Sequence, residues 1–354
     1  MKRTISLLLT LCLCSIHALA YGARGHALVG AIADKRLEQN QTIAQKVSDL
    51  LDGMTLEEAA NLPDFIKSWD GCTFNQHPSK KPVTDKPRIN AELRAFLNAN
   101  PCSSKRFHRN FHFTDVPVVG TENYDDGHVG NQFGVGRNTF DIVQLISYCV
   151  GVLQGDIPKK NKRAITKAVA IVLLAHYLGD IHQPLHVGAE YFTRKNGKGI
   201  PFEPSKTNKG FQDQGGNKLT LLTLNGTTFV KTGKNLHNFW DELAVTEAFH
   251  GADDANIAAL LGTQEPANWQ LSGDPKTWAQ QMADDILPSA REAHDRLSFE
   301  NINIVTGMRE IKSGNAKEKN TSGDSYTSWA GCIVKDEIHK GGWRLAALLE
   351  EALQ

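Results

Sequence analysis

Histidine and aspartate gather in one short segment, His176 to His186, whose sequence is HYLGDIHQPLH. His176 and Asp180 are four residues apart, and residues at this spacing lie on one face of a helix. The preceding run, 168–175, is apolar, so this face is expected to point inward. A buried carboxylate among histidines is costly unless it is paired or bound to a metal. The segment therefore predicts a metal site, in which the two oxygens of Asp180 can bridge two ions.

The same spacing recurs at His237 and Asp241, in the segment NLHNFWD. One such pair is a weak signal, because a helix with a solvated histidine–aspartate pair has the same pattern. Two pairs favour a metal centre, particularly since Pro184 is placed to end the first helix and His186 can then turn towards a second ion. A mixture of imidazole and carboxylate ligands is typical of zinc.

Three other stretches offer further ligands. His112 stands between two phenylalanines, and Asp64 follows a proline at an expected helix start. His26 is close to the expected mature N-terminus. Each has an ordinary alternative: His112 fits a hydrogen-bonded core histidine, and Asp64 fits a helix N-cap.

Apolar residues recur with a helical period along most of the chain. Helices are expected at 26–51 (as one or two), from Thr55 with a capping box to Glu58, and at 91–99, 139–153, 164–178, 236–249, 275–297 and 343–353. One β-hairpin is expected at 219–231, around Asn225-Gly226. The pattern predicts an all-α fold class: a single mainly helical domain over 21–354, with a small β-hairpin excursion and surface insertions at about 71–109 and 187–214.

The first twenty residues have the three parts of a signal peptide. Met1-Lys2-Arg3 is charged, Ile5 to Cys14 is apolar, and Ala18-Leu19-Ala20 offers a small-residue cleavage site. The apolar run is too short to span a bilayer. We expect cleavage after Ala20, a mature chain that starts at Tyr21 and is secreted or periplasmic, and no stable membrane association.

Four cysteines lie beyond the expected signal peptide: Cys72, Cys102, Cys149 and Cys332. An oxidising compartment favours disulfides, and four cysteines allow three pairings. A bond between Cys72 and Cys102 is one expectation, because both flank the same polar segment. Four buried free thiols are the alternative.

The formal net charge is zero, so no overall field attracts a polyanion. A nucleic acid would have to be attracted locally, for example by metal ions. A basic loop at 194–209 could contact phosphates, but a run of this kind is more often a solvated surface insertion.

These motifs resemble the class I zinc nucleases, which comprise fungal single-strand-specific nucleases, plant endonucleases and trypanosomatid 3′-nucleotidase/nucleases. That family shares a fold with the bacterial zinc phospholipases C. The resemblance runs from Tyr21 to about Leu349, where Gly342-Trp343-Arg344-Leu345-Ala346 is similar to the family's closing helix. Its most specific parts are the segment from His176 to His186 and the pair His237–Asp241.

The resemblance implies three zinc ions. It assigns the first ion to Asp64, His112, His176 and Asp180. It assigns the second ion to His186, His237 and Asp241. It assigns the third ion to His26, the other oxygen of Asp180, and the free amino group and carbonyl of Tyr21.

The resemblance also implies a mechanism. Two ions bridged by Asp180 would supply hydroxide from a shared water, Asp64 would orient it, and Lys67 would stabilise charge on phosphorus. The remaining zinc would stabilise the departing 3′ oxygen, which leaves 5′-phosphate products. Phe113 and Asp115 lie where the family stacks and hydrogen-bonds a base, and stacking worth about 1–3 kcal/mol needs an unpaired strand. We therefore expect a monomer that acts on single-stranded DNA and RNA, and also on 3′-nucleotides.

Three features depart from the family pattern. Tyr21 stands where the family usually has tryptophan, and Lys67 stands where its better-studied members usually have arginine, which alone offers a planar fork of donors. The spacing from Asp64 to His112 is long, and Asp70 is a competitor for the role of Asp64.

Two other functions remain open at this point. A zinc phospholipase C would carry the same metal cluster, but it typically has glutamate where this chain has Asp241, which favours the nuclease. A non-enzymatic zinc-binding protein would not need Asp64 or Lys67.

Overall fold

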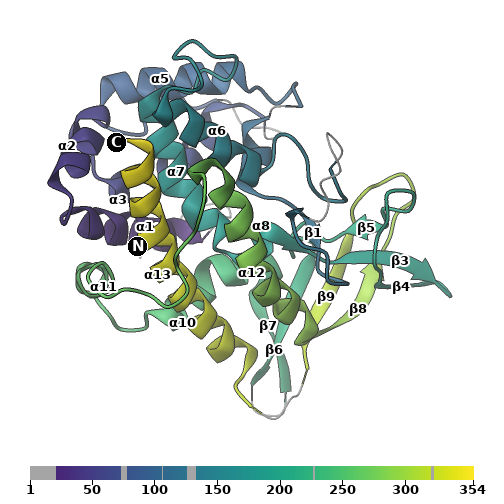
Figure 1. The fold of residues 1–354 in the computed structure, drawn as a ribbon. Helices are drawn as coiled ribbons and strands as arrows, with labels where there is room; N and C mark the ends of the chain where they lie inside the picture. The colour runs from purple at the N-terminus through teal and green to yellow at the C-terminus, as the bar shows by residue number, and fades with distance from the viewer. Residues whose placement is uncertain (1–20, 73–77, 106, 126–132, 226–227, 320–322) are drawn as a thin grey trace, which may run out of the picture.

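Helices α1 (Gly22–Leu37), α7 (Lys167–Ile181) and α13 (Tyr326–Ala352) pack against one another at the centre of the body (Figure 1). The structure is a computed structural model that describes residues 21–72, 78–105, 107–125, 133–225, 228–319 and 323–354; the expected signal peptide lies outside these ranges. α7 is buried from Ala168 to Ile181, as expected of a helix that is apolar all round. α1 and α13 meet so closely that a Cβ on Gly342 would lie 2.4 Å from Ile32 Cγ2.

The remaining helices surround this centre. They are α2 (Gln41–Leu50), α3 (Leu56–Ala59), α4 (Leu62–Phe65), η1 (Ile66–Trp69), α5 (Pro87–Ala99), η2 (His108–His112), α6 (Ile142–Gln154), α8 (Pro184–Val187), α9 (Leu236–Asn238), η4 (Phe239–Leu243), α10 (Ala244–Ala248), α11 (Asp254–Leu261), η5 (Pro275–Thr277) and α12 (Trp278–Asp295).

Most expected helices are confirmed, with changes at their ends. The range 26–51 forms two helices, and Asn40 caps the second by accepting from Ile43 N. The predicted capping box is present, since Thr55 accepts from Glu58 N and Glu58 accepts from Thr55 N. The range 236–249 is a helix in three pieces, with a π-helical segment in the middle. The closing helix begins at Tyr326 rather than at Trp343.

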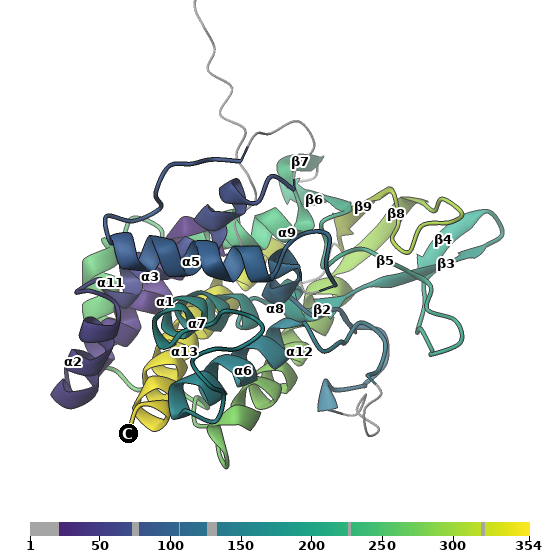
Figure 2. The ribbon, with the colours of Figure 1, turned by 90° about the horizontal axis from the view of Figure 1, so that it is seen from above.

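The described residues also form three sheets, which lie on one side of the helical body (Figure 2). Their strands are β1 (Val116–Pro117), β2 (Gly188–Ala189), β3 (Tyr191–Lys195), β4 (Lys198–Pro201), β5 (Phe211–Gln212), β6 (Leu219–Asn225), β7 (Thr228–Asn235), β8 (Leu297–Asn303) and β9 (Ser313–Glu318). β1 pairs with β2, and the other sheets have the orders β4-β3-β5 and β7-β6-β9-β8.

The all-α prediction is therefore right for the body and too narrow for the whole chain. The expected hairpin exists as β6 and β7, although its Asn225-Gly226 turn reaches outside the described residues at Gly226. It is not an isolated excursion, because β6 also pairs in parallel with β9, and the paired residues Leu219 and Gly314 are 95 residues apart in the sequence. β9 has the sequence SGNAKE, which lacks the β-branched alternation of a typical strand. Its strand conformation is set by its two neighbours.

The two expected insertions have regular structure. The first contains α5 and a disulfide between Cys72 and Cys102, with Cα atoms 6.0 Å apart, which confirms that pairing. Cys149 is a buried free thiol and Cys332 an exposed one, so the alternative of four free thiols is wrong. The second insertion forms the sheet β4-β3-β5. In the described parts of the chain, no helix is both long enough and apolar enough to cross a bilayer.

Replacing both Cys72 and Cys102 by serine is expected to lower the free energy of unfolding by about 2–4 kcal/mol, because the bond closes a loop across a sequence separation of 30 and so restricts the unfolded chain. Denaturant unfolding measures this. Cys332→Ser is the matched control and is expected to leave the midpoint unchanged. Equal midpoints for the double variant and the control would contradict the prediction.

Candidate metal centre

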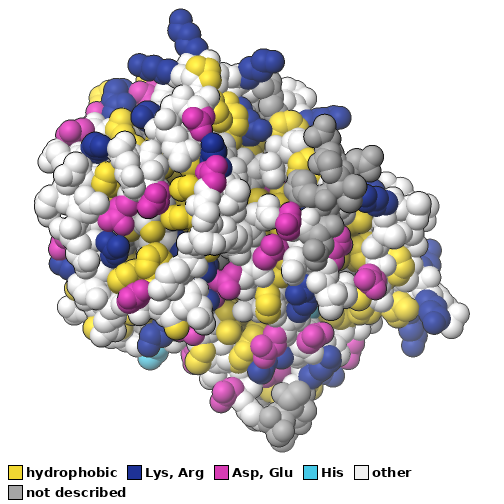
Figure 3. Space-filling view, viewed as in Figure 1, with side chains coloured by type: hydrophobic (Ala, Val, Ile, Leu, Met, Phe, Trp, Pro, Cys, Tyr) yellow, Lys and Arg dark blue, Asp and Glu magenta, His cyan; other side chains and the backbone are white. Residues whose placement is uncertain are grey.

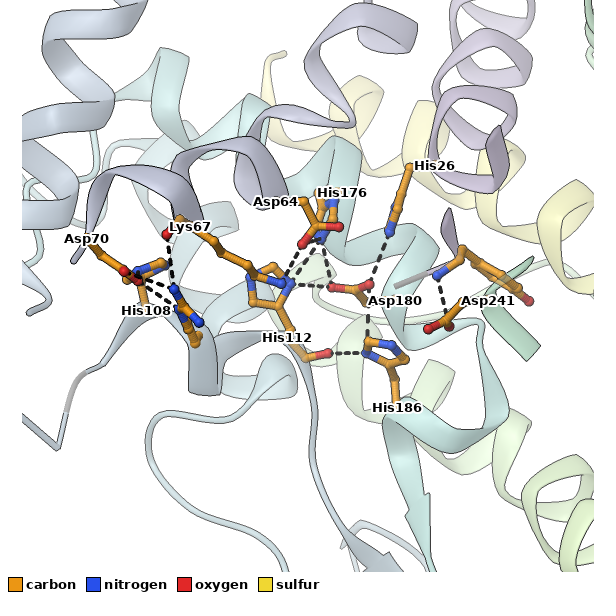
Figure 4. Close-up of polar contacts among 12 residues, drawn as sticks. His26, Asp64, Lys67, Asp70, His108, His112, His176, Asp180, His186 and Asp241 are labelled. Carbon is orange, nitrogen blue, oxygen red and sulfur yellow. Dashed lines mark hydrogen bonds and ion pairs between the residues drawn. The ribbon is translucent and has the colours of Figure 1, made fainter. Parts of the chain in front are cut away.

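The candidate ligands converge where several elements end (Figure 4). They are His26 on α1, Asp64 on α4, His112 on η2, His176 and Asp180 on α7, His186 on α8, His237 on α9 and Asp241 on η4. All are buried. Their ligand atoms form three groups in which all atoms lie within 4.8 Å of one another: His26, Asp64 and His176; His112, His176 and Asp180; and His186, His237 and Asp241.

Asp180 is fully buried at the middle of the centre. Its Oδ2 lies 2.9 Å from His112 Nδ1 and 3.1 Å from His176 Nε2. Its Oδ1 faces the other way, 3.3 Å from His26 Nε2 and 3.7 Å from His186 Nδ1. Burial alone would raise the Asp180 pKa, but His176 and His186 outweigh it and hold this pKa well below its ordinary value. The carboxylate is therefore ionised, with one oxygen available on each side.

Three of the histidines are oriented by backbone carbonyl oxygens. Each Nδ1 donates over 2.7 Å to one carbonyl: His176 to Ala60, His186 to His112, and His237 to Gly215. A carbonyl can only accept, so Nδ1 carries a proton, and in the neutral ring Nε2 then has the lone pair. Carbonyl acceptors of this kind fix the tautomer and the ring orientation of metal-binding histidines.

One carboxylate oxygen of Asp180 and one ring nitrogen from each of two histidines form a nearly equilateral triangle. His176 Nε2 lies 3.0 Å from His112 Nδ1, and both lie about as far from Asp180 Oδ2. An ion at about 2 Å from each nitrogen and oxygen fits such a triangle. Asp64 Oδ1 is 3.7 Å from His176 Nε2, so it can approach the same ion.

The second group is held by backbone and amide donors. Asp241 Oδ1 accepts from Tyr21 N at 3.1 Å and from Gln183 Nε2 at 2.8 Å. Its Oδ2 faces His237 Nε2 at 3.5 Å. Asp241 belongs to the π-helical segment, and such segments are frequent at functional sites. Two donors on one oxygen leave the other oxygen for an ion.

His26 reaches the centre because α1 and α7 touch. A Cβ on Gly179 would lie 2.6 Å from His26 Nδ1, so only glycine fits there. The ring of His26 stacks on that of His176 with centroids 3.8 Å apart. Tyr21, assigned by the resemblance to the same ion, uses its carbonyl to accept from Gly25 N at 3.1 Å.

The centre contains buried polar atoms without hydrogen-bond partners. Six buried atoms have no hydrogen-bond partner within the described residues: both ring nitrogens of His26, Asp64 Oδ2, Asp180 Oδ1, His186 Nε2 and Asp241 Oδ2. Buried polar atoms are normally hydrogen-bonded. Burial, as the main cause, also lowers the pKa of His112 and His186 to about 3, so both rings are neutral and able to bind a metal. These residues fit metal ions, and their donor set fits zinc.

Asp64 and Lys67 form an ion pair beside the triangle. Burial alone would raise the pKa of Asp64, but Lys67 and the neighbouring histidines outweigh it and hold this pKa well below its usual range. The Lys67 side chain is 24% exposed, so it can contact both Asp64 and a bound molecule.

Asp70, the competitor for the role of Asp64, belongs to a different cluster. It accepts from Arg109 Nε at 2.7 Å and lies 2.8 Å from His108 Nε2. Arg109 also donates to the carbonyl of Lys67 at 3.0 Å. Asp70 therefore helps to fix the backbone that carries Lys67, and it is absent from the three ligand groups.

Phe113 and Asp115 follow His112 directly along the chain. Phe113 is 37% exposed, an unusual degree for a large apolar side chain in this protein, whereas Asp115 is buried. Burial, Asp213 and Asp141 raise the Asp115 pKa to about 7. An exposed aromatic ring next to a carboxyl group whose pKa is near neutral pH is suited to a planar, hydrogen-bonding ligand.

Sequence reasoning missed the groups that orient the ligands. The carbonyls of Ala60 and Gly215 leave no signal in residue type. Gly215 and Gly216 leave a partial signal, because their positions favour glycine. Both have positive φ, and a Cβ on Gly215 would lie 2.1 Å from the Leu185 carbonyl oxygen. Gln183 lies within the segment from His176 to His186, but no sequence pattern marks this glutamine as a hydrogen-bond donor to Asp241.

Comparisons with known proteins place this chain in a family. A family model described as S1/P1 Nuclease matches residues 21–354. Endonuclease 1 of Arabidopsis thaliana is 25% identical over 357 residues, which cover 98% of this chain and 92% of the plant protein. Endonuclease 5 of the same plant is 24% identical over 94% of this chain and 90% of its own length. Endonuclease 4 is 27% identical over 51% of this chain and 49% of its own length.

Asp180→Asn is expected to lower the number of divalent ions bound per chain by at least one, because the amide removes the charge of a carboxylate that belongs to one ligand group and lies beside His26 and His186 of the other two. Metal analysis of the purified, dialysed protein measures this. Asp70→Asn removes the same charge from the neighbouring cluster and is expected to keep the full metal content. A full metal content in Asp180→Asn would contradict the central place of this residue.

Proposed function

Because the chain belongs to the S1/P1 nuclease family, we propose that it is a zinc-dependent hydrolase that cleaves single-stranded DNA and RNA to 5′-phosphate products and also acts on 3′-nucleotides. The observation that carries this proposal is the presence of three buried ligand groups, each with at least one member beside the carboxylate of Asp180. The full-length similarity to plant endonucleases supports it. The phospholipase alternative is not favoured, since Asp241 stands where that enzyme class typically has glutamate.

Three zinc ions would be held by the residues of the centre. His112, His176, Asp180 and Asp64 would hold one, His186, His237 and Asp241 a second, and His26, Asp180 and the N-terminal residue a third. Bound zinc would lower the pKa of a coordinated water and so supply hydroxide at neutral pH. The third site would use the amino group of Tyr21, which rests on the proposal that the chain is exported and cleaved after Ala20.

The side chains around the centre have separate roles in this proposal. Asp64 is ionised and accepts a hydrogen bond from the attacking water, which aims its lone pair at phosphorus. Lys67 stabilises negative charge that develops on the phosphoryl oxygens. Phe113 stacks on a base, and Asp115 meets the edge of that base with a carboxyl group that can either donate or accept. Stacking requires an unpaired base, so a duplex is a poor substrate.

The protein without its signal peptide is expected to cleave single-stranded DNA and RNA in a zinc-dependent manner and to leave 5′-phosphate ends. Activity should be lost with a chelator and restored by zinc, and it should be absent in Asp180→Ala. Gel analysis with end-group determination measures this, with the equivalent duplex as the control. A protein with a full zinc complement that cleaves neither single strand would sink the proposal, and phosphatidylcholine would be the next substrate.

Lys67→Met is expected to reduce kcat by roughly 10²–10³-fold, because it removes one charged donor that acts on the transition state. KM should change little. Lys67→Arg should recover most of the activity, since it keeps the charge and adds a second donor. Steady-state kinetics on a single-stranded oligonucleotide measure both variants. Equal loss in the methionine and arginine variants would show that Lys67 acts only through the position of Asp64.

A further inference from the structure

Residues 191–212, here called the basic arm, carry an excess of positive charge. They comprise β3, β4, β5 and the connecting loops, and their charged side chains are Arg194, Lys195, Lys198, Glu203, Lys206 and Lys209. The arm therefore has a net charge of +4, and the rest of the chain has −4, since the total is zero. The β3–β4 pair projects from the body in both ribbon views, and lysine and arginine side chains gather there at the right edge of Figure 3.

The five cations of the arm are exposed, and none forms an ion pair in the described part of the chain, where many other lysines and arginines do. Lys195 and Lys198 are even paired directly across the two strands. Like charges in this arrangement destabilise a hairpin. Arg194 donates to the Ile304 carbonyl oxygen, but no carboxylate among the described residues neutralises the charge of the arm.

Both ends of the arm start beside the metal centre. Tyr191, at the start of β3, is five residues after His186, and its hydroxyl donates to the Asp115 carbonyl at 2.8 Å. Gln212, at the end of β5, is three residues before Gly215, whose carbonyl orients His237. A nucleic acid strand that runs from the metal centre in the direction of β3 would therefore pass along the arm. β3 spans about 13 Å, at ~3.3 Å per residue.

The arm is fixed in position rather than free. Gln212 N donates to the Arg309 carbonyl at 3.1 Å, and Ile311 N donates to the Gln212 carbonyl at 3.0 Å. A Cβ on Gly199 would lie 2.4 Å from Ile302 Cγ2, so β4 touches β8 without a gap. The loop that joins β8 to β9 lies on the same side of the molecule. It carries two further exposed cations, Arg309 and Lys312.

We propose that the basic arm binds the sugar-phosphate backbone of a single-stranded nucleic acid beyond the nucleotides at the metal centre, so that the preferred substrate is a polynucleotide rather than a mononucleotide. This inference rests on the nuclease function proposed above. Exposed, unpaired cations on a rigid support attract phosphates without reading sequence. Each phosphate contact on a single strand releases counterions and adds about 0.7 to the slope of log affinity against log salt.

The test compares a strand of about 20 nucleotides with a dinucleotide, using the zinc-loaded protein. In the triple variant Lys195→Ser, Lys198→Ser and Lys206→Ser, KM for the long strand should rise roughly tenfold at low salt, and the salt slope should fall by about 2. The dinucleotide is too short to reach the arm, so its kcat and KM should not change. The control is the triple variant Lys159→Ser, Lys160→Ser and Lys167→Ser. These lysines are exposed and lie at or just before the start of α7, whereas Asp180 is at its other end. The control should leave KM for both substrates unchanged.

The possible failures are distinct. An unchanged KM for the long strand, with normal dinucleotide cleavage, overturns the inference and leaves the nuclease function intact. Equal effects of the two triple variants also overturn it, because the attraction would then be general. The inference is also overturned, in favour of a membrane surface, if the arm variant loses binding to anionic phospholipid vesicles while its KM for the long strand does not change. If neither substrate is cleaved, the nuclease function falls, and fluorescence anisotropy of a labelled 20-nucleotide strand still tests the arm by the same salt slope.

Discussion

The carboxylate of Asp180 is ionised although no part of it reaches solvent, and the histidines that lie against it come from four helices. His176 is on the same helix, His112 and His186 come from the segments on either side, and His26 is brought by α1. An isolated buried carboxylate would be protonated instead. The tight α1–α7 contact at Gly179 is therefore part of the electrostatics as much as of the packing.

The sequence could indicate candidate ligands because their pattern is local. Two histidine–aspartate pairs at helical spacing indicated the residues, and the structure brings His186, His237 and Asp241 together as one group. The sheets were harder, since the strand SGNAKE forms only when β6 and β8 supply its backbone partners. The orienting carbonyls were out of reach, because a backbone oxygen is the same in every residue. Propensity and periodicity describe segments, whereas these features arise between segments distant in sequence.

Charge is distributed unevenly over a chain whose total is zero. The acidic groups of the centre are buried among histidines, while the arm presents exposed cations that form no ion pair among the described residues. Net charge therefore says little about whether a polyanion is attracted, because the field near a surface depends on where the charges lie within about one Debye length, roughly 10 Å at 0.1 M salt. A neutral protein can in this way hold a strong local field and still avoid binding anions over its whole surface.

The carbonyl anchors of His176, His186 and His237 have a consequence for how this protein can diverge. A side chain that orients a ligand is lost in a single substitution, but a carbonyl is kept whatever residue carries it, as long as the backbone follows the same path. The neighbours of the ligands are thus free to drift. Divergence as large as that from the plant relative, at 25% identity, is compatible with this way of orienting the ligands, because it depends on the backbone path at positions such as Gly215 rather than on the neighbouring side chains.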